Sequence, residues 1–185
     1  MTNLLEVDWS SIPAPQDDGM ANHLEGSALP AVGLHSTNGQ VVDLSLLAGR
    51  TVMYVYPMTG QPGVALPDGW DMIPGARGCT PQSCAFRDHF ADLQALGVGQ
   101  LFGLSTQPTD YQKEAADRLQ LPFALLSDAD FSLATKLNLP SFDVAGSRLL
   151  KRLTLIVDDA SITKVFYPVF PPDRSVTDVL NWLRS

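Results

Sequence analysis

Two cysteines, Cys79 and Cys84, are the residues whose type and spacing most clearly allow chemistry. They are the only cysteines among 185 residues, and they lie five positions apart where a loop is expected to become a helix. A thiol at the start of a helix lies near unpaired backbone N–H groups and the positive end of the helix dipole, both of which favour the thiolate. We therefore interpret Cys79 as a candidate nucleophile and Cys84 as its candidate partner.

The segment after Cys79 has the pattern of a helix that begins near Pro81. Thr80 offers a hydroxyl that can cap such a helix, and proline suits the first helical position. Downstream, apolar residues recur at three- and four-residue steps, which predicts one buried stripe. They are Phe86, Phe90, Leu93 and Leu96. We expect the helix to end by Gly97 or Gly99, because glycine commonly closes a helix.

Strands and helices alternate along the rest of the chain. The Asn38-Gly39 turn between two apolar runs predicts an N-terminal hairpin, and Thr51 to Tyr56 has the unbroken apolar pattern of a strand buried on both faces. Further strands are expected near 101–105, 123–126, 153–157 and 162–167, and helices near 110–119, 130–137 and 175–183, the last capped by Ser175. This order predicts an α/β fold with a central mixed β-sheet flanked by helices on both faces.

The length predicts one domain with a substantial core. Residues 1–28 lack a clear period and are interpreted as an N-terminal extension wrapped on the surface, which leaves 29–185 as the single domain. A long loop from Pro57 to Arg77 holds four glycines and four prolines, and long ordered loops are usually functional. Trp70, near its end, is expected to anchor the loop by packing.

Charge and hydropathy exclude several function classes. Twelve basic and twenty acidic residues give a formal net charge of −8, which would repel a phosphate backbone, so nucleic-acid binding is not expected. No apolar run is long enough to predict a membrane span. The first residues have neither the positive region nor the apolar stretch of a secretory signal. We therefore expect a cytoplasmic protein, and in a reducing compartment a cysteine pair is more often catalytic than structural.

The run Gly78-Cys79-Thr80-x-x-x-Cys84-x-Phe86-Arg87-Asp88 resembles the active-site motif of the Q-type peroxiredoxins, also called the bacterioferritin-comigratory type. Further landmarks resemble that family in the family's order, and the match covers roughly residues 29 to 185. They are Tyr56-Pro57, Gly103 to Thr106, Leu121 to Asp128, and Arg152 to Asp158. The resemblance implies a thioredoxin-like fold and thiol-dependent reduction of hydrogen peroxide or organic hydroperoxides.

By this resemblance, Cys79 is the peroxidatic cysteine, Cys84 the resolving cysteine, and Arg152 the cation that stabilises thiolate and peroxide. A sulfenic acid on Cys79 would condense with Cys84 to an intramolecular disulfide. The expected partners are a peroxide and a thioredoxin or glutaredoxin-like reductant, with the protein a monomer or homodimer. No cofactor is expected, and the scattered histidines do not form metal spacing with the cysteines.

One position departs from the family's pattern. The family usually has a threonine three residues before the reactive cysteine, where its hydroxyl helps to hold the peroxide, and this chain has Ala76. The loop before Cys79 is also longer than the family's, and Pro74 or Thr59 are candidates to replace the missing group. Two alternatives therefore stay open, a thiol–disulfide oxidoreductase and a non-enzymatic redox sensor on the same fold. The first usually uses Cys-x-x-Cys, whereas four residues separate these cysteines.

The spacing also constrains how the two cysteines can react with each other. Residues five apart on one helix have Cα atoms roughly 8 to 9 Å apart. A disulfide needs Cα atoms within about 7 Å. We therefore expect the first turn of the helix to unwind before Cys79 and Cys84 can bond.

Overall fold

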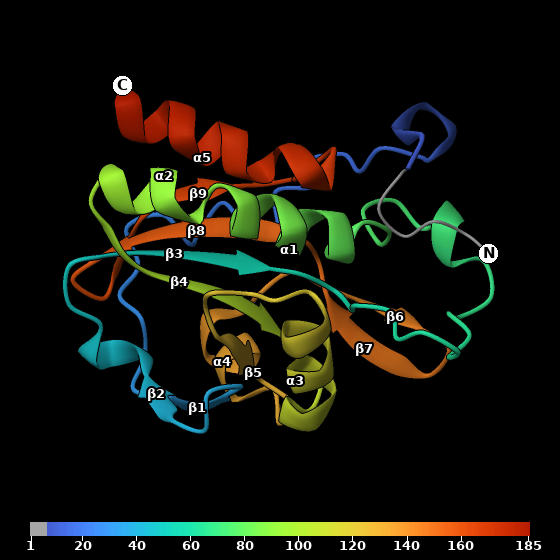
Figure 1. Ribbon diagram of the computed structural model, residues 1–185, viewed down its shortest axis with the longest axis horizontal. Helices are drawn as coiled ribbons and strands as arrows, with labels where there is room; N and C mark the ends of the chain where they lie inside the picture. Colours follow the sequence, from blue (N-terminus) through green and yellow to red (C-terminus); the bar gives the residue numbers. More distant parts are fainter. Residues whose placement is uncertain (1–6) are drawn as a thin grey trace.

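A seven-stranded mixed β-sheet forms the centre of the computed structural model, which describes residues 7–185 (Figure 1). The strand order is β2-β1-β5-β4-β3-β8-β9, with β3, β4 and β5 parallel and the other neighbours antiparallel. Its strands are β1 (Gly33–Ser36), β2 (Val41–Asp43), β3 (Arg50–Val55), β4 (Val98–Ser105), β5 (Leu125–Ser127), β8 (Leu153–Asp158) and β9 (Ser161–Phe166). The predicted mixed sheet and N-terminal hairpin are confirmed.

Helices cover both faces of this sheet. The α-helices are α1 (Cys79–Asp88), α2 (Phe90–Ala95), α3 (Thr109–Arg118), α4 (Ser132–Leu137) and α5 (Ser175–Arg184). Short 3-10 turns are η1 (Trp9–Ser11), η2 (Leu44–Leu46), η3 (Trp70–Met72) and η4 (Pro172–Arg174). Figure 1 shows α1, α2 and α5 along one side of the sheet. Successive side chains of β3 point to opposite faces of the sheet. Tyr54 belongs to the core cluster that includes residues of α1 and α5, whereas Met53 belongs to the cluster that includes residues of α4.

The predicted helix after Cys79 is in fact two helices. The chain bends at His89, where α1 ends, and α2 continues only to Ala95. The predicted apolar stripe is confirmed, because Phe86 and Leu93 are fully buried in one core cluster with Phe90 and Leu96 packed against them. The bend therefore keeps both short helices on the same face of the sheet.

The predicted capping residues of two helices are wrong. Gly78 is the N-cap of α1, in a left-handed conformation, and Thr80 already lies inside the first turn, where its side chain makes no cap bond. Pro81 is tolerated there because its missing N–H would have no partner inside the helix. Ser175 is likewise the first residue of α5 because η4 runs directly into the helix, and its hydroxyl lies 3.0 Å from that of Thr154.

A second, two-stranded sheet, which was not predicted, consists of β6 (Ser141–Val144) and β7 (Ser147–Leu150). Ala145 and Gly146 form its turn, and both have positive φ. The hairpin packs against the long loop through Phe142, which lies 6.4 Å from Trp70 between ring centroids. It therefore helps to hold the segment that leads to Cys79.

The N-terminal segment is attached to the domain at several points. Leu24 is fully buried in the core, while Asp18 accepts hydrogen bonds from Lys151 and Tyr167. Trp9 donates its indole N–H to Asp173 at 3.0 Å. The predicted extension covers residues 1–28, of which 1–6 lie outside the described residues.

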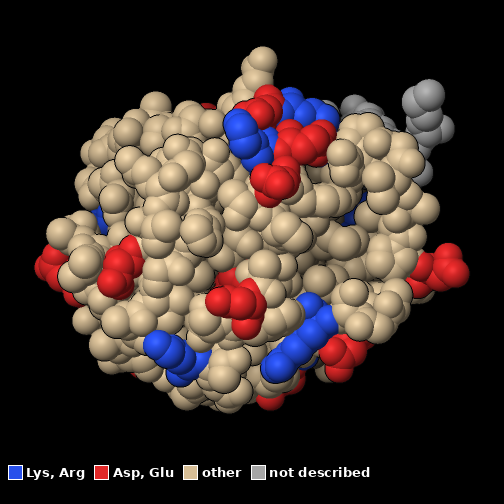
Figure 2. All heavy atoms as spheres, turned by 90° about the horizontal axis from the view of Figure 1, so that it is seen from below, with Lys and Arg blue, Asp and Glu red and all other residues tan. Residues whose placement is uncertain are grey.

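The surface agrees with the charge expected from composition. On the face shown in Figure 2, basic side chains stand singly or beside acidic ones, and no extended basic patch forms there. Within residues 7–185, every helix is too short or too polar to cross a lipid bilayer.

Candidate active site

Cys79 is the first residue of α1, at the end of the loop that leaves β3. Its side chain is almost completely buried, at 3% exposure, and packs in the same core cluster as Tyr54 and Phe86. The sulfur lies 3.7 Å from the carbonyl oxygen of Ala76. The thiol thus lies at the N-terminal end of a ten-residue helix, where the helix dipole favours a negative charge.

Gly78 makes this position possible. Its φ of +109° lies in a region that side chains with a Cβ rarely adopt. A Cβ there would lie only 2.7 Å from Pro172 Cγ and 2.7 Å from Trp9 Cη2. The start of α1 is therefore packed against both the N-terminal segment and η4, and only glycine fits between them.

Arg152 is brought to Cys79 by β8, the strand that pairs with β3. The residue immediately precedes β8, and its Nη2 lies 3.2 Å from the Sγ of Cys79. The same nitrogen donates to the carbonyl oxygens of Gly75, Ala76 and Arg77 at 3.3, 3.1 and 3.3 Å. Because Arg152 is only 3% exposed, its charge acts on the sulfur with little screening by water.

Gln82 fixes the other branch of the guanidinium. Its side-chain oxygen accepts a hydrogen bond from Nη1 of Arg152, and the residue is fully buried one turn after Cys79. No carboxylate forms an ion pair with Arg152 within residues 7–185. A neutral amide therefore orients the cation without cancelling its charge. Gln82 is not among the predicted site residues, although its place three residues after Cys79, on the same side of the helix, was a usable signal.

Cys84 lies in α1 as well, and both cysteines are free and buried. Burial raises the pKa of the Cys84 thiol above its ordinary value, and nearby Arg87 opposes part of this rise. Cys84 is therefore a protonated thiol at neutral pH. Since five positions of one helix separate it from Cys79, the two sulfurs cannot bond until the helix opens.

Ala76, near the end of the long loop, lies at the position where the family usually has a threonine. The methyl group of Ala76 is fully buried in a small cluster with Trp70 and Leu149, which confirms that Trp70 anchors the loop by packing. Thr59 does not replace the missing hydroxyl, because its own hydroxyl donates to Gln107 at 3.2 Å. Pro74 instead lines a separate pocket of about 250 Å³ on another side of Arg152.

Cys79 lines a small pocket between the long loop and α1. Its volume is about 30 Å³, and its walls include Met58, Leu66 and Trp70 from the long loop together with Thr80 from α1. Within the described part of the chain, no group of three His, Cys, Asp or Glu side chains lies close enough to hold a metal ion. The reactive group that lines this pocket is Cys79, whose sulfur contacts the buried guanidinium of Arg152.

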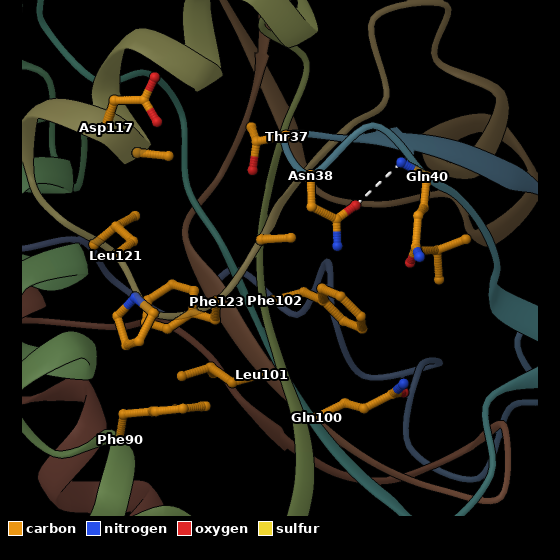
Figure 3. Close-up of a pocket in the computed structure, with 14 residues that line it drawn as sticks. Thr37, Asn38, Gln40, Phe90, Gln100, Leu101, Phe102, Asp117, Leu121 and Phe123 are labelled. Atoms are coloured by element: carbon orange, nitrogen blue, oxygen red, sulfur yellow. Dashed lines mark hydrogen bonds between the residues drawn. The ribbon is translucent and has the colours of Figure 1, made fainter.

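A much larger pocket, of about 470 Å³, lies elsewhere (Figure 3). Figure 3 shows Phe90, Phe102 and Phe123 around it, with Asn38 and Gln40 joined by a hydrogen bond at its edge. None of the predicted site residues lines it. It includes residues from the first half of β4, whereas Cys79 follows the far end of the parallel neighbour β3, so the two sites lie at opposite ends of the sheet.

Comparisons with known proteins agree with this site. A model of the redoxin family matches residues 24–183. A chloroplastic peroxiredoxin Q of Sedum lineare is 29% identical over 177 residues, which are 95% of this chain and 86% of that protein. A chloroplastic peroxiredoxin Q of Oryza sativa subsp. japonica is 31% identical over 163 residues, which are 87% of this chain and 67% of that protein.

Solved structures share the fold. The peroxidoxin BcpB of Mycobacterium tuberculosis has a TM-score of 0.68 at 25% identity, covering 86% of this chain and 96% of that one. A peroxiredoxin Q of Xanthomonas campestris has a TM-score of 0.67 at 20% identity, covering 88% and 96%. Because the Xanthomonas campestris protein is only 20% identical, its similarity to this chain shows a shared fold alone.

Proposed function

The chain belongs to the redoxin family, among the Q-type peroxiredoxins, and on that basis we propose that it reduces peroxides with Cys79 as the attacking thiol. The observation that carries this assignment to particular residues is the 3.2 Å contact between Arg152 Nη2 and Cys79 Sγ. A buried guanidinium beside a sulfur at a helix start is the environment that activates a thiol.

In the first step, the thiolate of Cys79 attacks one oxygen of the peroxide. The O–O bond breaks, a sulfenic acid forms on Cys79, and the second oxygen leaves as water or an alcohol after taking up a proton. Arg152 stabilises the thiolate before the attack and the negative charge on the leaving oxygen during it. Gln82 supports this role by holding the guanidinium in place.

In the second step, the sulfur of Cys84 attacks the sulfenic acid, and a disulfide forms with loss of water. The reaction requires the first turn of α1 to unwind, because both residues belong to one helix. Unwinding also exposes Cys84 to water, which removes the burial that raises its pKa and makes its thiolate available.

An external dithiol then reduces the disulfide. A thioredoxin or a glutaredoxin-like protein suits this exchange, since the unwound segment presents the disulfide at the surface. We propose the cytoplasm as the compartment, because a cysteine pair that must be reduced after each turnover works in reducing surroundings. The plant relatives are chloroplastic, which is a property of those proteins.

Peroxide consumption with thioredoxin, its reductase and NADPH tests the proposal. We expect catalytic NADPH oxidation that depends on peroxide and is abolished in Cys79→Ser. Stoichiometric oxidation of Cys79 without repeated turnover would instead identify a redox sensor. Disulfide reduction without peroxide consumption would identify a thiol–disulfide oxidoreductase.

A further inference from the structure

We propose that the loop from Pro57 to Arg77 restricts the substrate of Cys79 to hydrogen peroxide and excludes bulky alkyl hydroperoxides. The inference rests on the proposed peroxidase function and adds a substrate class to it. The residues that carry it are Leu66 and Trp70, which separate the pocket at Cys79 from a larger depression outside.

The size of the pocket at Cys79 is the first argument. Its volume is about 30 Å³. The depression on the outer side of the loop is about ten times larger. Hydrogen peroxide is the smallest peroxide and is expected to enter the small pocket. The aryl or branched alkyl group of a larger hydroperoxide is expected to be held back by its walls.

The chemistry of the walls is the second argument. Met58, Leu66 and Trp70 contribute apolar groups, and the buried methyl group of Ala76 packs against the same cluster. The threonine hydroxyl expected near this position is therefore replaced by packing between two segments of the loop. Arg152 contacts the sulfur without lining this pocket, whose walls give Cys79 an apolar cover on the loop side.

The cover is held in place by hydrogen bonds at both ends of the loop. Gln107 accepts from the backbone N–H of Thr59 at 3.0 Å and donates to its carbonyl oxygen at 3.2 Å. Arg118 donates to the carbonyl oxygen of Gly60 at 3.0 Å. Arg77, at the far end, forms an ion pair with Asp71. These bonds oppose the outward movement that a bulky substrate would need.

A shallow depression of about 300 Å³ lies on the outer side of the cover. Leu66 and Trp70 line both this depression and the small pocket, whereas Cys79 lines only the small pocket. The two side chains thus form the wall between the sulfur and a space large enough for an aryl group. Shortening Leu66 is expected to join the two spaces.

Stopped-flow measurement of Cys79 oxidation in the full chain, with hydrogen peroxide and with cumene hydroperoxide, tests this inference. In the wild type we expect the second-order rate constant for hydrogen peroxide to be at least about tenfold higher, a ratio that pocket shape can supply. Leu66→Ala is expected to reduce this ratio to about threefold or less by accelerating the reaction with cumene hydroperoxide.

Val64→Ala is the matched control, because Val64 belongs to the same loop, is 55% exposed and lines neither space. Its ratio is expected to equal that of the wild type.

Met58→Ala provides a second enlargement of the pocket in case Leu66→Ala disturbs the loop, which circular dichroism would reveal. Equal rate constants for both peroxides in the wild type, or an unchanged ratio in both enlarged variants, would overturn the inference while leaving the peroxidase function intact. If neither peroxide oxidises Cys79, the proposed function fails first.

Discussion

Arg152 and Cys79 are 73 positions apart in the sequence, yet Nη2 of the first lies 3.2 Å from Sγ of the second. Strand pairing brings them together. Val55, the last residue of β3, pairs with Leu153, the first residue of β8. Arg152 therefore emerges at the end of the sheet where the chain leaves β3 towards Cys79. The contact depends on the register of two antiparallel central strands, which is fixed by their buried side chains.

Replacing Arg152 with lysine is expected to slow the oxidation of Cys79 about 100-fold, the effect of losing one preorganised donor in an active site. Lysine keeps the charge but cannot donate to Cys79, Gln82 and three carbonyl groups at once from a planar group. Stopped-flow kinetics with hydrogen peroxide measure the rate. Arg148→Lys, at an exposed position of β7, is the control and is expected to react at the wild-type rate.

The buried strands and helix faces around the site were predictable, because the spacing of apolar residues indicates which side chains are buried. The strand at Thr51 to Tyr56 and the stripe of Phe86 and Leu93 follow directly from apolar spacing. Helix starts were less predictable, since Gly78 caps α1 through a backbone conformation that tertiary packing imposes. The hairpin of β6 and β7 was missed because an Ala145-Gly146 turn lacks the usual asparagine or aspartate. Gln82 acquires its role only through a strand that lies far away in the sequence.

Gly78→Ala is expected to lower the free energy of unfolding by about 3 kcal/mol, as the sum of backbone strain and overpacking. The added Cβ would meet Pro172 and Trp9 in addition to the positive φ. Gly146→Ala is the matched control, because it has a φ of +76° and open space around the position. It is expected to cost only about 1 kcal/mol. Urea unfolding of both variants measures the difference, and equal losses would show that the packing at Gly78 contributes nothing.

Oxidation is expected to open the first turn of α1. After one equivalent of peroxide, amide hydrogen exchange at residues 79–84 is predicted to become faster in the wild type. Cys84→Ser is expected to accumulate sulfenic acid on Cys79 and to keep slow exchange, because no disulfide pulls the turn open. Mass spectrometry of peptides across α1 detects both outcomes. A disulfide with unchanged protection would contradict the requirement for unwinding, and rapid oxidation of Cys84 in Cys79→Ser would reverse the assigned roles.

Acid is expected to weaken the attachment of the N-terminal segment. Hydrogen bonds from Lys151 and Tyr167 lower the pKa of Asp18 from 3.8 to about 2. Because the unfolded chain binds this proton more tightly than the folded protein, Asp18 stabilises the fold above pH 3.8, and this contribution disappears as the pH falls towards about 2. Asp18→Asn is expected to cost up to about 1 kcal/mol at neutral pH, in keeping with its partial exposure.

Urea unfolding at several pH values measures this effect. The stability of Asp18→Asn is expected to vary less than that of the wild type between pH 3.8 and about 2. Asp17→Asn is the control, since an asparagine can still accept the hydrogen bond from the N–H of Gly19. Its pH dependence is expected to follow the wild type, and the same flattening in both variants would point to a general charge effect.

The packing around Gly78 has a practical consequence for anyone who handles this protein. Trp9, close to the beginning of the chain, and Pro172, close to its end, both lie against the residue that precedes Cys79. Trimming the chain past Trp9, or from Pro172 onwards, therefore removes a group that packs against the residue before the reactive sulfur. Kinetic comparisons need preparations that keep both residues.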